Sequence, residues 1–351
     1  MRIGLYDPYL DTLGGGEKYI LDIATCLEKD NSVSLFWDDP QILPAAEKRF
    51  NIHLSRIHIL PNIFKSQKSL LEKFLVTRRF DVIIFLSDGS VPWLFAKKNI
   101  LLFQFPVQWV QIKSFMDKQK LARITSIICY SDFVKGFLDA TFHKDAIVIP
   151  PAISLPSQVS LKKQNIILSV GRFTKAMNTK KQEVLIQAFK EMTTKGLKDW
   201  TLILAGGVLP EDEDFVERLR TLAKGHSIEI FQNISYGELQ DLYQSAKIYW
   251  HAAGFGEDLE KYPERAEHFG ITTLEAMAYG VVPVVFNAGG QREIIKNEEN
   301  GLLWHTVEEL QQKTQQLIEN GIFWKRLSVG AKKQAETYSE RKFCEKIQLL
   351  V

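Results

Sequence analysis

Short apolar runs rich in β-branched residues alternate along the chain with longer segments of helical periodicity. This alternation is typical of a parallel sheet whose strands are joined by crossover helices. In the first half, the apolar runs predict strands near 3–6, 32–36, 57–59, 82–86, 100–103, 126–130 and 146–149. In the second half, they predict strands near 165–170, 201–205, 228–231, 248–251, 282–286 and 301–304.

Helix starts and a linker complete the predicted organisation. The segment 17–27 has helical spacing, and Ser235, Thr272 and Thr306 each stand three residues before a glutamate, which predicts capping boxes. Pro150-Pro151 and the polar stretch to residue 164 predict an interdomain linker. We therefore predict an α/β protein with two Rossmann-like doubly wound domains facing a cleft, where ligands meet the carboxyl ends of the strands. The predicted domains are 1–155 and 156–330, with a C-terminal helix at 331–351 that packs back toward the first domain.

Composition narrows the class of protein. With 351 residues, 45% hydrophobic and 25% charged, the chain is neither disordered nor a multi-span membrane protein. Asp7 leaves no room for the apolar core of a signal peptide, so we predict a cytoplasmic protein. Cys26, Cys129 and Cys344 lie far apart without CxxC spacing, and we predict reduced, mostly buried thiols with neither a disulfide nor a zinc site.

Charge is unevenly distributed although the net charge is only +2. Residues 48–123 contain 14 Lys and Arg against 4 Asp and Glu. Such a block can attract an anionic membrane surface, which predicts peripheral contact with the inner membrane face, or it can be a solvated basic face. We predict no nucleic-acid partner.

Two segments place glycines or cations directly after a predicted strand. Gly14-Gly15-Gly16 follows the first strand and precedes a helix, where a backbone can approach an anion, although a plain turn explains it equally. Gly171-Arg172 and Lys180-Lys181 follow the first strand of the second half. Their guanidinium and ammonium groups can neutralise a diphosphate, and the alternative is solvated loop charge.

The most informative segment contains Glu267 and Glu275, separated by seven residues. If Glu267 precedes the helix and Gly270 turns the chain, both carboxylates can border one pocket at the helix start. The alternatives are a capping role for Glu275 and one more acid in a charged loop for Glu267. Residues 287–293 form another glycine-containing loop after a strand, suited to a phosphate or a ring.

Other chemistry-bearing residues support weaker hypotheses. His251 and His268 lack partners at metal-ligand spacing and are interpreted as structural. The aromatic residues Phe103, Phe105 and Trp109 either line a pocket for a sugar or lipid or belong to the core.

Taken together, these motifs resemble those of the retaining glycosyltransferases of family 4, which have the GT-B fold. Glu267 and Glu275 match the E-x7-E signature of that family, and Gly171-Arg172 with Lys180 match its phosphate-side cations. The segments 149–151, 235–239 and 300–303 follow in the family's order. The loops 14–18 and 267–270 also resemble mannosyltransferases that extend lipid-linked oligosaccharides.

The resemblance implies roles for individual residues. Arg172 and Lys180, with Lys181, would hold the donor diphosphate, Glu267 would contact the transferred sugar, and Glu275 would bind the ribose. The further implied donor contacts are Gly15, Gly16, Gly206, Asn233, Phe269, Gly270, Ile271 and Thr272. On the acceptor side, Gln104, Phe105 and Trp109 lie in the loop where many relatives carry a histidine that is absent here.

The expected reaction moves a hexosyl unit from a nucleoside-diphosphate sugar, such as GDP-mannose or a UDP-sugar, to a glycan or lipid-linked acceptor in polysaccharide biosynthesis. Because no D-x-D cluster is suitably placed, protein cations replace a metal, and we predict no metal and no cofactor. No carboxylate nucleophile is apparent, so retention of configuration is expected. The alternatives are an epimerase or hydrolase of the same fold, or a non-catalytic sugar-nucleotide-binding relative.

Overall fold

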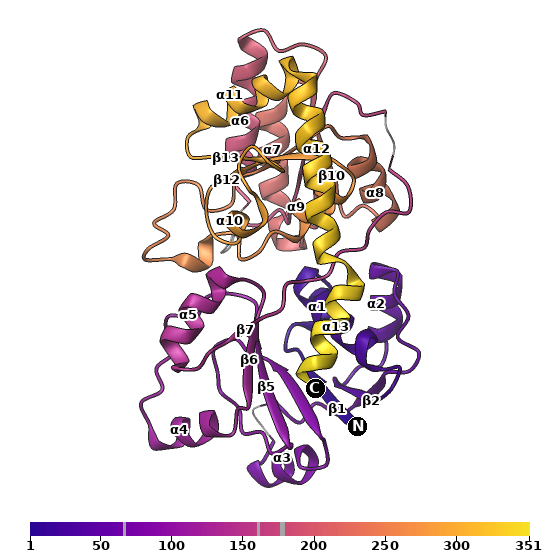
Figure 1. Cartoon of the computed structure of the whole chain (residues 1–351), viewed down its shortest axis with the longest axis vertical. Coiled ribbons are helices and arrows are strands. Elements are labelled where there is room, and N and C mark those ends of the chain that lie inside the picture. The colour runs from indigo at the N-terminus through magenta and orange to yellow at the C-terminus, as the bar shows by residue number, and fades with distance from the viewer. Residues whose placement is uncertain (66–67, 160–161, 176–179) are drawn as a thin grey trace. The chain divides into compact units, whose positions relative to one another are not determined.

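The computed structural model describes residues 1–65, 68–159, 162–175 and 180–351 (Figure 1). The chain divides into two compact units. Unit 1 contains Met1–Ala152 and Glu340–Val351, and unit 2 contains Ile153–Ser339. Among the described residues, no helix combines the length and apolar character needed to cross a bilayer.

Unit 1 is built on a parallel sheet of seven strands in the order β3-β2-β1-β4-β5-β6-β7. Its strands read as near-continuous apolar runs, as expected when helices cover both faces of a parallel sheet. The strands are β1 (Arg2–Tyr6), β2 (Ser32–Phe36), β3 (His58–Leu60), β4 (Val82–Leu86), β5 (Lys98–Phe103), β6 (Ser126–Cys129) and β7 (Ile147–Val148). The α-helices are α1 (Gly15–Leu27), α2 (Ile42–Phe50), α3 (Leu70–Thr77), α4 (Phe115–Ala122), α5 (Asp132–Phe142) and α13 (Glu340–Leu350).

Unit 2 contains a second parallel sheet, of six strands in the order β10-β9-β8-β11-β12-β13. Its strands are β8 (Ile166–Val170), β9 (Thr201–Gly206), β10 (Ile228–Gln232), β11 (Ile248–His251), β12 (Val282–Phe286) and β13 (Leu302–Trp304). Its α-helices are α6 (Gln182–Thr194), α7 (Glu213–Ala223), α8 (Tyr236–Ser245), α9 (Ile271–Ala278), α10 (Gln291–Ile294), α11 (Val307–Glu319) and α12 (Gly321–Ala335). All strands predicted from the apolar runs are therefore found, within one or two residues.

The helix-start predictions have mixed outcomes. Ser235 forms the predicted capping box with Glu238, and the Thr306 hydroxyl accepts the N–H of Glu309. The capping box predicted at Thr272 is wrong, because α9 begins at Ile271 after Gly270, whose φ is 117°. The Thr272 hydroxyl instead donates to the carbonyl of Val170 at 3.2 Å, so a tertiary contact replaces the local one.

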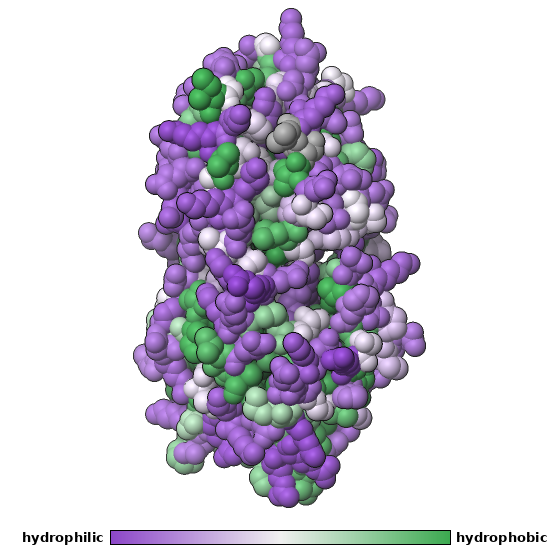
Figure 2. Space-filling model, turned by 45° about the vertical axis from the view of Figure 1, so that its right-hand side comes forward, coloured by the Kyte–Doolittle hydropathy of each residue, from purple (hydrophilic) through white to green (hydrophobic). Residues whose placement is uncertain are grey.

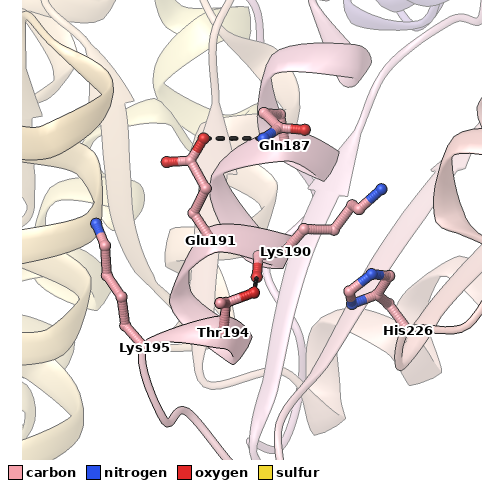
Figure 3. Close-up of a pocket in the computed structure, with 6 residues that line it drawn as sticks. All are labelled: Gln187, Lys190, Glu191, Thr194, Lys195 and His226. Carbon is pink, nitrogen blue, oxygen red and sulfur yellow. Dashed lines mark hydrogen bonds between the residues drawn. The ribbon is translucent and has the colours of Figure 1, made fainter.

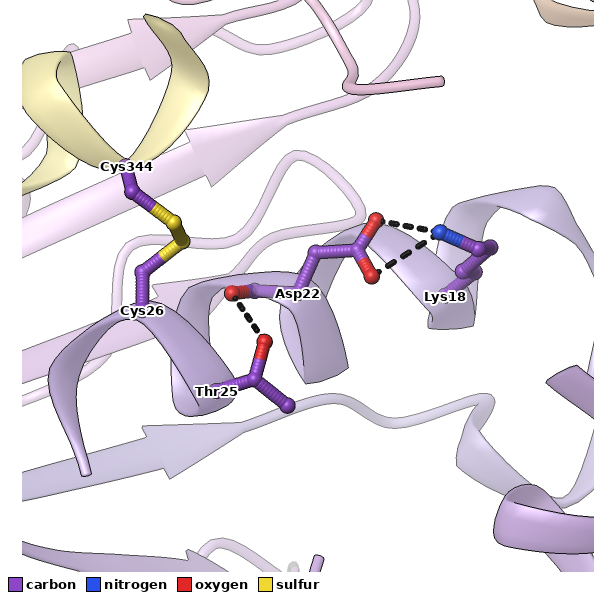
Figure 4. The surroundings of a disulfide bond; sticks show 5 residues. All are labelled: Lys18, Asp22, Thr25, Cys26 and Cys344. Atoms are coloured by element: carbon purple, nitrogen blue, oxygen red, sulfur yellow. Dashed lines mark hydrogen bonds and ion pairs between the residues drawn. A yellow bond between two sulfur atoms is a disulfide. The ribbon is translucent and has the colours of Figure 1, made fainter. Parts of the chain in front are cut away.

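The prediction of three reduced cysteines is also wrong. Cys26 on α1 and Cys344 on α13 form a disulfide (Figure 4) across a sequence separation of 318 residues. Figure 1 shows the yellow α13 lying beside α1, which brings together two cysteines that no local spacing relates. Cys129 is a buried free thiol, as predicted.

Candidate functional site

The order of strands in unit 2 places a topological switch point between β8 and β11. Sequential connections run to one side from β8 through β9 to β10, and to the other side from β11 through β12 to β13. The loops that leave two such strands diverge and open a crevice at their carboxyl ends, which is where doubly wound sheets bind ligands. Gly171 and Arg172 follow β8 directly, and His251 is the last residue of β11.

Close backbone packing explains the glycines beside this crevice. A Cβ on Gly206 would lie 2.0 Å from the carbonyl oxygen of Gly171, so only glycine lets the loops after β8 and β9 approach. The Asn233 N–H donates to the Gly206 carbonyl at 2.9 Å, and its side-chain oxygen accepts the Val208 N–H at 3.0 Å. The structure therefore brings together Gly171, Gly206 and Asn233, three positions that sequence analysis singled out separately.

At the centre of the crevice, Glu267 carries two side-chain partners on one oxygen. Lys180 Nζ lies 2.8 Å from its Oε2, and His251 Nε2 lies 2.7 Å from the same atom. The side chains are 17%, 14% and 2% exposed for Lys180, Glu267 and His251. Three residues from different parts of the chain thus form one nearly enclosed polar cluster that contains the Lys180–Glu267 ion pair.

The cluster sets the ionisation of Glu267. Burial by itself raises the pKa of a carboxyl group, but the Lys180 ammonium and the His251 hydrogen bond outweigh burial here and hold the pKa of Glu267 well below its usual range. Glu267 is therefore a carboxylate near neutral pH. Its negative charge is already engaged by protein donors, which makes it a weak base and a weak nucleophile.

The loop containing Glu267 is held by glycines on a neighbouring loop. A Cβ on Gly289 would lie 2.2 Å from the Glu267 carbonyl oxygen, and one on Gly290 would lie 2.5 Å from the Cα of Phe269. The Gly290 N–H also donates to the Glu267 carbonyl at 2.8 Å. The glycines of this loop thus admit the backbone that carries Glu267, and the suitability of the loop for a phosphate or a ring stays a prediction.

The predicted phosphate-side cations lie in different surroundings. Lys181 precedes α6 with φ of 54°, in the left-handed region that is uncommon outside glycine, and pairs with Glu257. Glu257 also pairs with Arg265 at 2.7 Å, so the loop that contains Glu257 anchors Lys181. Arg172 is exposed, and its guanidinium makes no hydrogen bond or ion pair with any residue that the structure describes.

Around the start of α9, side chains point into the fold while the backbone remains at the crevice. Phe269 is 2% exposed and packs edge-on against Tyr338. Glu275 accepts a hydrogen bond from the buried Tyr243 hydroxyl at 2.9 Å. Ile271 and Thr272 begin the helix after Gly270, and the amide groups of a first helical turn have no partner within the helix. Any contact of Phe269 with a ligand is therefore made by its backbone.

In unit 1, the predicted glycine loop and the predicted acceptor loop meet. The Gln104 side-chain amide donates to the Gly16 carbonyl at 2.9 Å, and a Cβ on Gly16 would lie 2.3 Å from the Gln104 Oε1. Glu17 accepts the Gly14 N–H at 2.7 Å, so a carboxylate already occupies this helix start. Gly15 is the first residue of α1.

Trp109 is 55% exposed and stacks on Phe105 at 6.0 Å between ring centres. Phe103, by contrast, is fully buried and belongs to the core.

A surface pocket of about 310 Å³ lies elsewhere in unit 2 (Figure 3). Its lining comes from the second half of α6 and from His226, and includes none of the predicted site residues. Because α6 starts beside the crevice and runs away from it, the pocket lies toward the amino ends of the strands, away from the crevice.

His251 belongs to the cluster around Glu267, although the absence of metal-ligand spacing around it favours a structural interpretation from the sequence. Its place at the end of an apolar strand was visible in the sequence, but only the strand order of the sheet makes that strand a central one.

Comparison with known proteins adds independent findings. The model of the family described as glycosyl transferases group 1 matches residues 154–334, just over half of the chain. A GDP-Man:Man(3)GlcNAc(2)-PP-Dol alpha-1,2-mannosyltransferase of Dictyostelium discoideum is 28% identical over 219 residues, which are 58% of this chain and 41% of that protein. The chain thus spans about two fifths of that relative's length. An uncharacterized glycosyltransferase of Haemophilus influenzae is 24% identical over 366 residues, 98% of both chains.

Solved structures agree on the fold. A glycosyltransferase of Rickettsia africae has a TM-score of 0.77 at 18% identity, covering 99% of this chain and 97% of that one. Anabaena HepE in complex with UDP has a TM-score of 0.72 at 17% identity, covering 100% and 99%. The predicted class of two Rossmann-like domains of the GT-B type is confirmed.

Proposed function

The chain belongs to the glycosyl transferases group 1 family, and we propose that it transfers a mannosyl or related hexosyl unit from a nucleoside-diphosphate sugar to a glycan or lipid-linked acceptor. The observation that carries this proposal is the Lys180–Glu267–His251 cluster at the switch point of unit 2. It places a cation and a carboxylate where a sheet of this type binds a nucleotide.

The proposed chemistry uses protein cations in place of a metal. When the bond between the sugar C1 and the diphosphate breaks, negative charge develops on the leaving oxygen. Arg172, exposed and without a partner among the described residues, and Lys180 can stabilise that charge, as can the amide groups that begin α9. The acceptor oxygen forms the new bond to C1, and its proton passes to the leaving phosphate oxygen.

Retention of configuration follows from the proposed chemistry. Glu267 is held as a weakly nucleophilic carboxylate by its two donors, so we expect no covalent intermediate on it. Because the acceptor proton passes to the leaving phosphate oxygen, we expect the acceptor to attack the face of the sugar from which the phosphate departs. Following the reaction by NMR gives the anomeric configuration of the first product formed. An inverted product would exclude this mechanism.

For the donor, GDP-mannose has support in the name of the Dictyostelium relative, which includes GDP-Man. Thermal unfolding with GDP, UDP, ADP and CDP at equal concentration tests this choice. A nucleotide present at 100 times its dissociation constant stabilises the fold by about 2.7 kcal/mol. A larger shift with UDP than with GDP would instead favour a UDP-sugar.

A donor-only incubation separates the alternative activities from transfer. An epimerase or hydrolase consumes the donor without an acceptor, whereas a transferase needs the acceptor for turnover at full rate. The relatives from Dictyostelium and Haemophilus are both named as transferases, which supports the proposed function over these alternatives.

We also propose that unit 1 contacts an anionic membrane through α3 and α4. None of the residues of α4 is buried, and Phe115 and Met116 at its start are 75% and 57% exposed. In α3, only Thr77 is buried and Leu71 is 65% exposed. Exposed apolar residues occur elsewhere on the surface too (Figure 2), so exposure alone is not specific.

The two helices are linked to each other through Phe95 and lie in a basic part of the sequence. Phe95 contacts Phe74 of α3 at 5.0 Å between ring centres and lies 4.5 Å from the Arg123 guanidinium carbon at the end of α4. Both helices lie within the basic block 48–123. Apolar side chains beside Lys and Arg suit a bilayer of anionic lipid, because the acyl region accepts the apolar groups and the headgroups attract the cations.

Flotation with phosphatidylglycerol-containing and purely phosphatidylcholine vesicles tests this contact. We expect binding to the anionic vesicles that weakens with salt, and a loss of binding in F115S/M116S. Ile322→Ser is the matched control, because Ile322 is 86% exposed but lies in unit 2, outside the basic block. Equal binding to both kinds of vesicle would contradict the proposal that α3 and α4 recognise anionic lipid.

A further inference from the structure

We infer that His251 is the positioning residue that keeps Glu267 in place while Lys180 engages the donor diphosphate. This inference rests on the proposed function, because it assigns different roles to His251 and Lys180 in the same cluster. The sequence interpretation of His251 as a structural residue does not account for its contact with the Glu267 carboxylate at the crevice.

The first step of the argument is that Lys180 has two competing partners. Its ammonium pairs with Glu267 at 2.8 Å, yet the proposed function also assigns it to the diphosphate. A lysine carries one charge on a flexible stem, so a doubly charged phosphate group draws it away from the carboxylate. Glu267, only 14% exposed, would then lose its cation, and a buried carboxylate without a partner is strongly destabilised.

The second step is that His251 cannot leave in the same way. It is 2% exposed, it ends β11 in the middle of the sheet, and its Nε2 lies 2.7 Å from Glu267 Oε2. An imidazole has two side-chain torsions and is confined here by packing, so its hydrogen bond survives a movement of Lys180. Both contacts use Oε2, so neither of them occupies Oε1.

The third step concerns the proton on the imidazole. The Nδ1 atom of His251 is buried and has no hydrogen-bond partner in the part of the chain that the structure describes. An N–H at that position would be an unsatisfied buried donor, so the hydrogen belongs on Nε2, facing the carboxylate. The tautomer that Glu267 requires is therefore the one that the surroundings of His251 favour.

Kinetics of three variants test this inference. For His251→Phe, which keeps a ring without a donor, we expect kcat to fall at least about tenfold while the donor KM changes less than about twofold. His251→Asn is too short to reach Glu267 and should behave in the same way if the phenylalanine variant does not fold. His251→Gln, which can present an N–H at similar reach, should recover kcat to within about threefold of the wild type.

Thr314→Val is the matched control. It removes a buried hydrogen bond from the neighbouring Trp250, whose indole N–H donates to the Thr314 hydroxyl at 2.9 Å, and successive strand residues face opposite sides of the sheet. We expect this variant to lower stability and leave kcat unchanged. In all four variants, the affinity for GDP or UDP, whichever stabilises the wild type, should stay within about twofold of the wild-type affinity.

The outcomes are distinguishable. If the wild-type protein transfers no sugar from any nucleoside-diphosphate donor, the proposed function fails. If the wild type transfers sugar but His251→Phe and His251→Asn retain full kcat, only the role of His251 is overturned. The same conclusion follows if His251→Gln is as impaired as the other variants, or if Thr314→Val lowers kcat equally.

Discussion

Replacement of Asp7 by asparagine tests how a buried carboxyl group at the end of β1 limits the stability of unit 1. Asp7 is fully buried, and its Oδ1 accepts the N–H of Tyr9 at 2.8 Å. Its Oδ2 is buried without a partner among the described residues. Burial raises the pKa of Asp7 from 3.8 to about 7, and the carboxylates of Glu17 and Asp11 add to the rise.

The sign of the pH effect follows from this shift. Between pH 4 and pH 7 the unfolded chain releases the Asp7 proton while the folded chain retains it, so the folded state loses stability as pH rises. The pKa of Asp7 differs by about three units between the unfolded and the folded chain, which corresponds to a loss of about 4 kcal/mol in the free energy of unfolding. This loss is nearly complete just above pH 7 and constant at higher pH. Asparagine does not titrate and keeps the acceptor for Tyr9. We expect D7N to be more stable than the wild type at pH 8, by at most this amount because its Nδ2 inherits the unpaired position.

Hydrogen exchange of a peptide covering β1, measured by mass spectrometry at pH 5 and pH 8, reports on the stability of unit 1. Wild type and variant are compared at each pH, which cancels the intrinsic dependence of exchange on pH. Asp30→Asn is the control, because Asp30 is exposed and has no burial penalty to lose. If the protection of wild type and D7N changes in parallel between the two pH values, the assignment of a burial penalty to Asp7 is wrong.

Three further predictions address packing, covalent structure and capping. Gly206→Ala should destabilise unit 2 by more than about 2 kcal/mol and abolish nucleotide binding, since its Cβ would meet the Gly171 carbonyl; urea unfolding and calorimetry check this. Cys26→Ser, or reduction of the bond to Cys344, should lower stability by about 2–5 kcal/mol, measured by thermal unfolding with and without reductant after thiol alkylation confirms the redox state. Ser235→Ala should cost about 1 kcal/mol in urea unfolding and leave kcat unchanged, and a null effect on stability would contradict the capping assignment.

Glu267 illustrates what could be inferred about the site from sequence. The hypothesis that it precedes the helix, with Gly270 turning the chain, agrees with its place in the loop before α9. That inference needed only a glycine and a run of helical residues within a few positions of each other. The bonds of Glu267 to Lys180 and His251 link residues 87 and 16 positions apart, and no local pattern relates their side chains.

Cys26 and Cys344, and likewise Gly289 and Gly290, show the same limit of inference from local sequence. Cys26 and Cys344 meet only because α13 packs on α1, and Gly289 and Gly290 are glycines because another loop crosses them. A glycine after a strand has the same local appearance whether a ligand or a neighbouring backbone approaches it. The local pattern therefore identified an important position without showing which neighbour requires the glycine.

The amino-acid sequence by itself determined the strands, the helix starts at Ser235 and Thr306 and the order of the motifs, because hydrophobic periodicity and capping depend on residues close together in the chain. The tertiary structure alone decided which strands are adjacent in each sheet, and with them which charges share the crevice of unit 2. The reason is that strand order is chosen by the burial of whole surfaces. Only after that choice do Lys180, His251 and Glu267 lie within hydrogen-bonding distance.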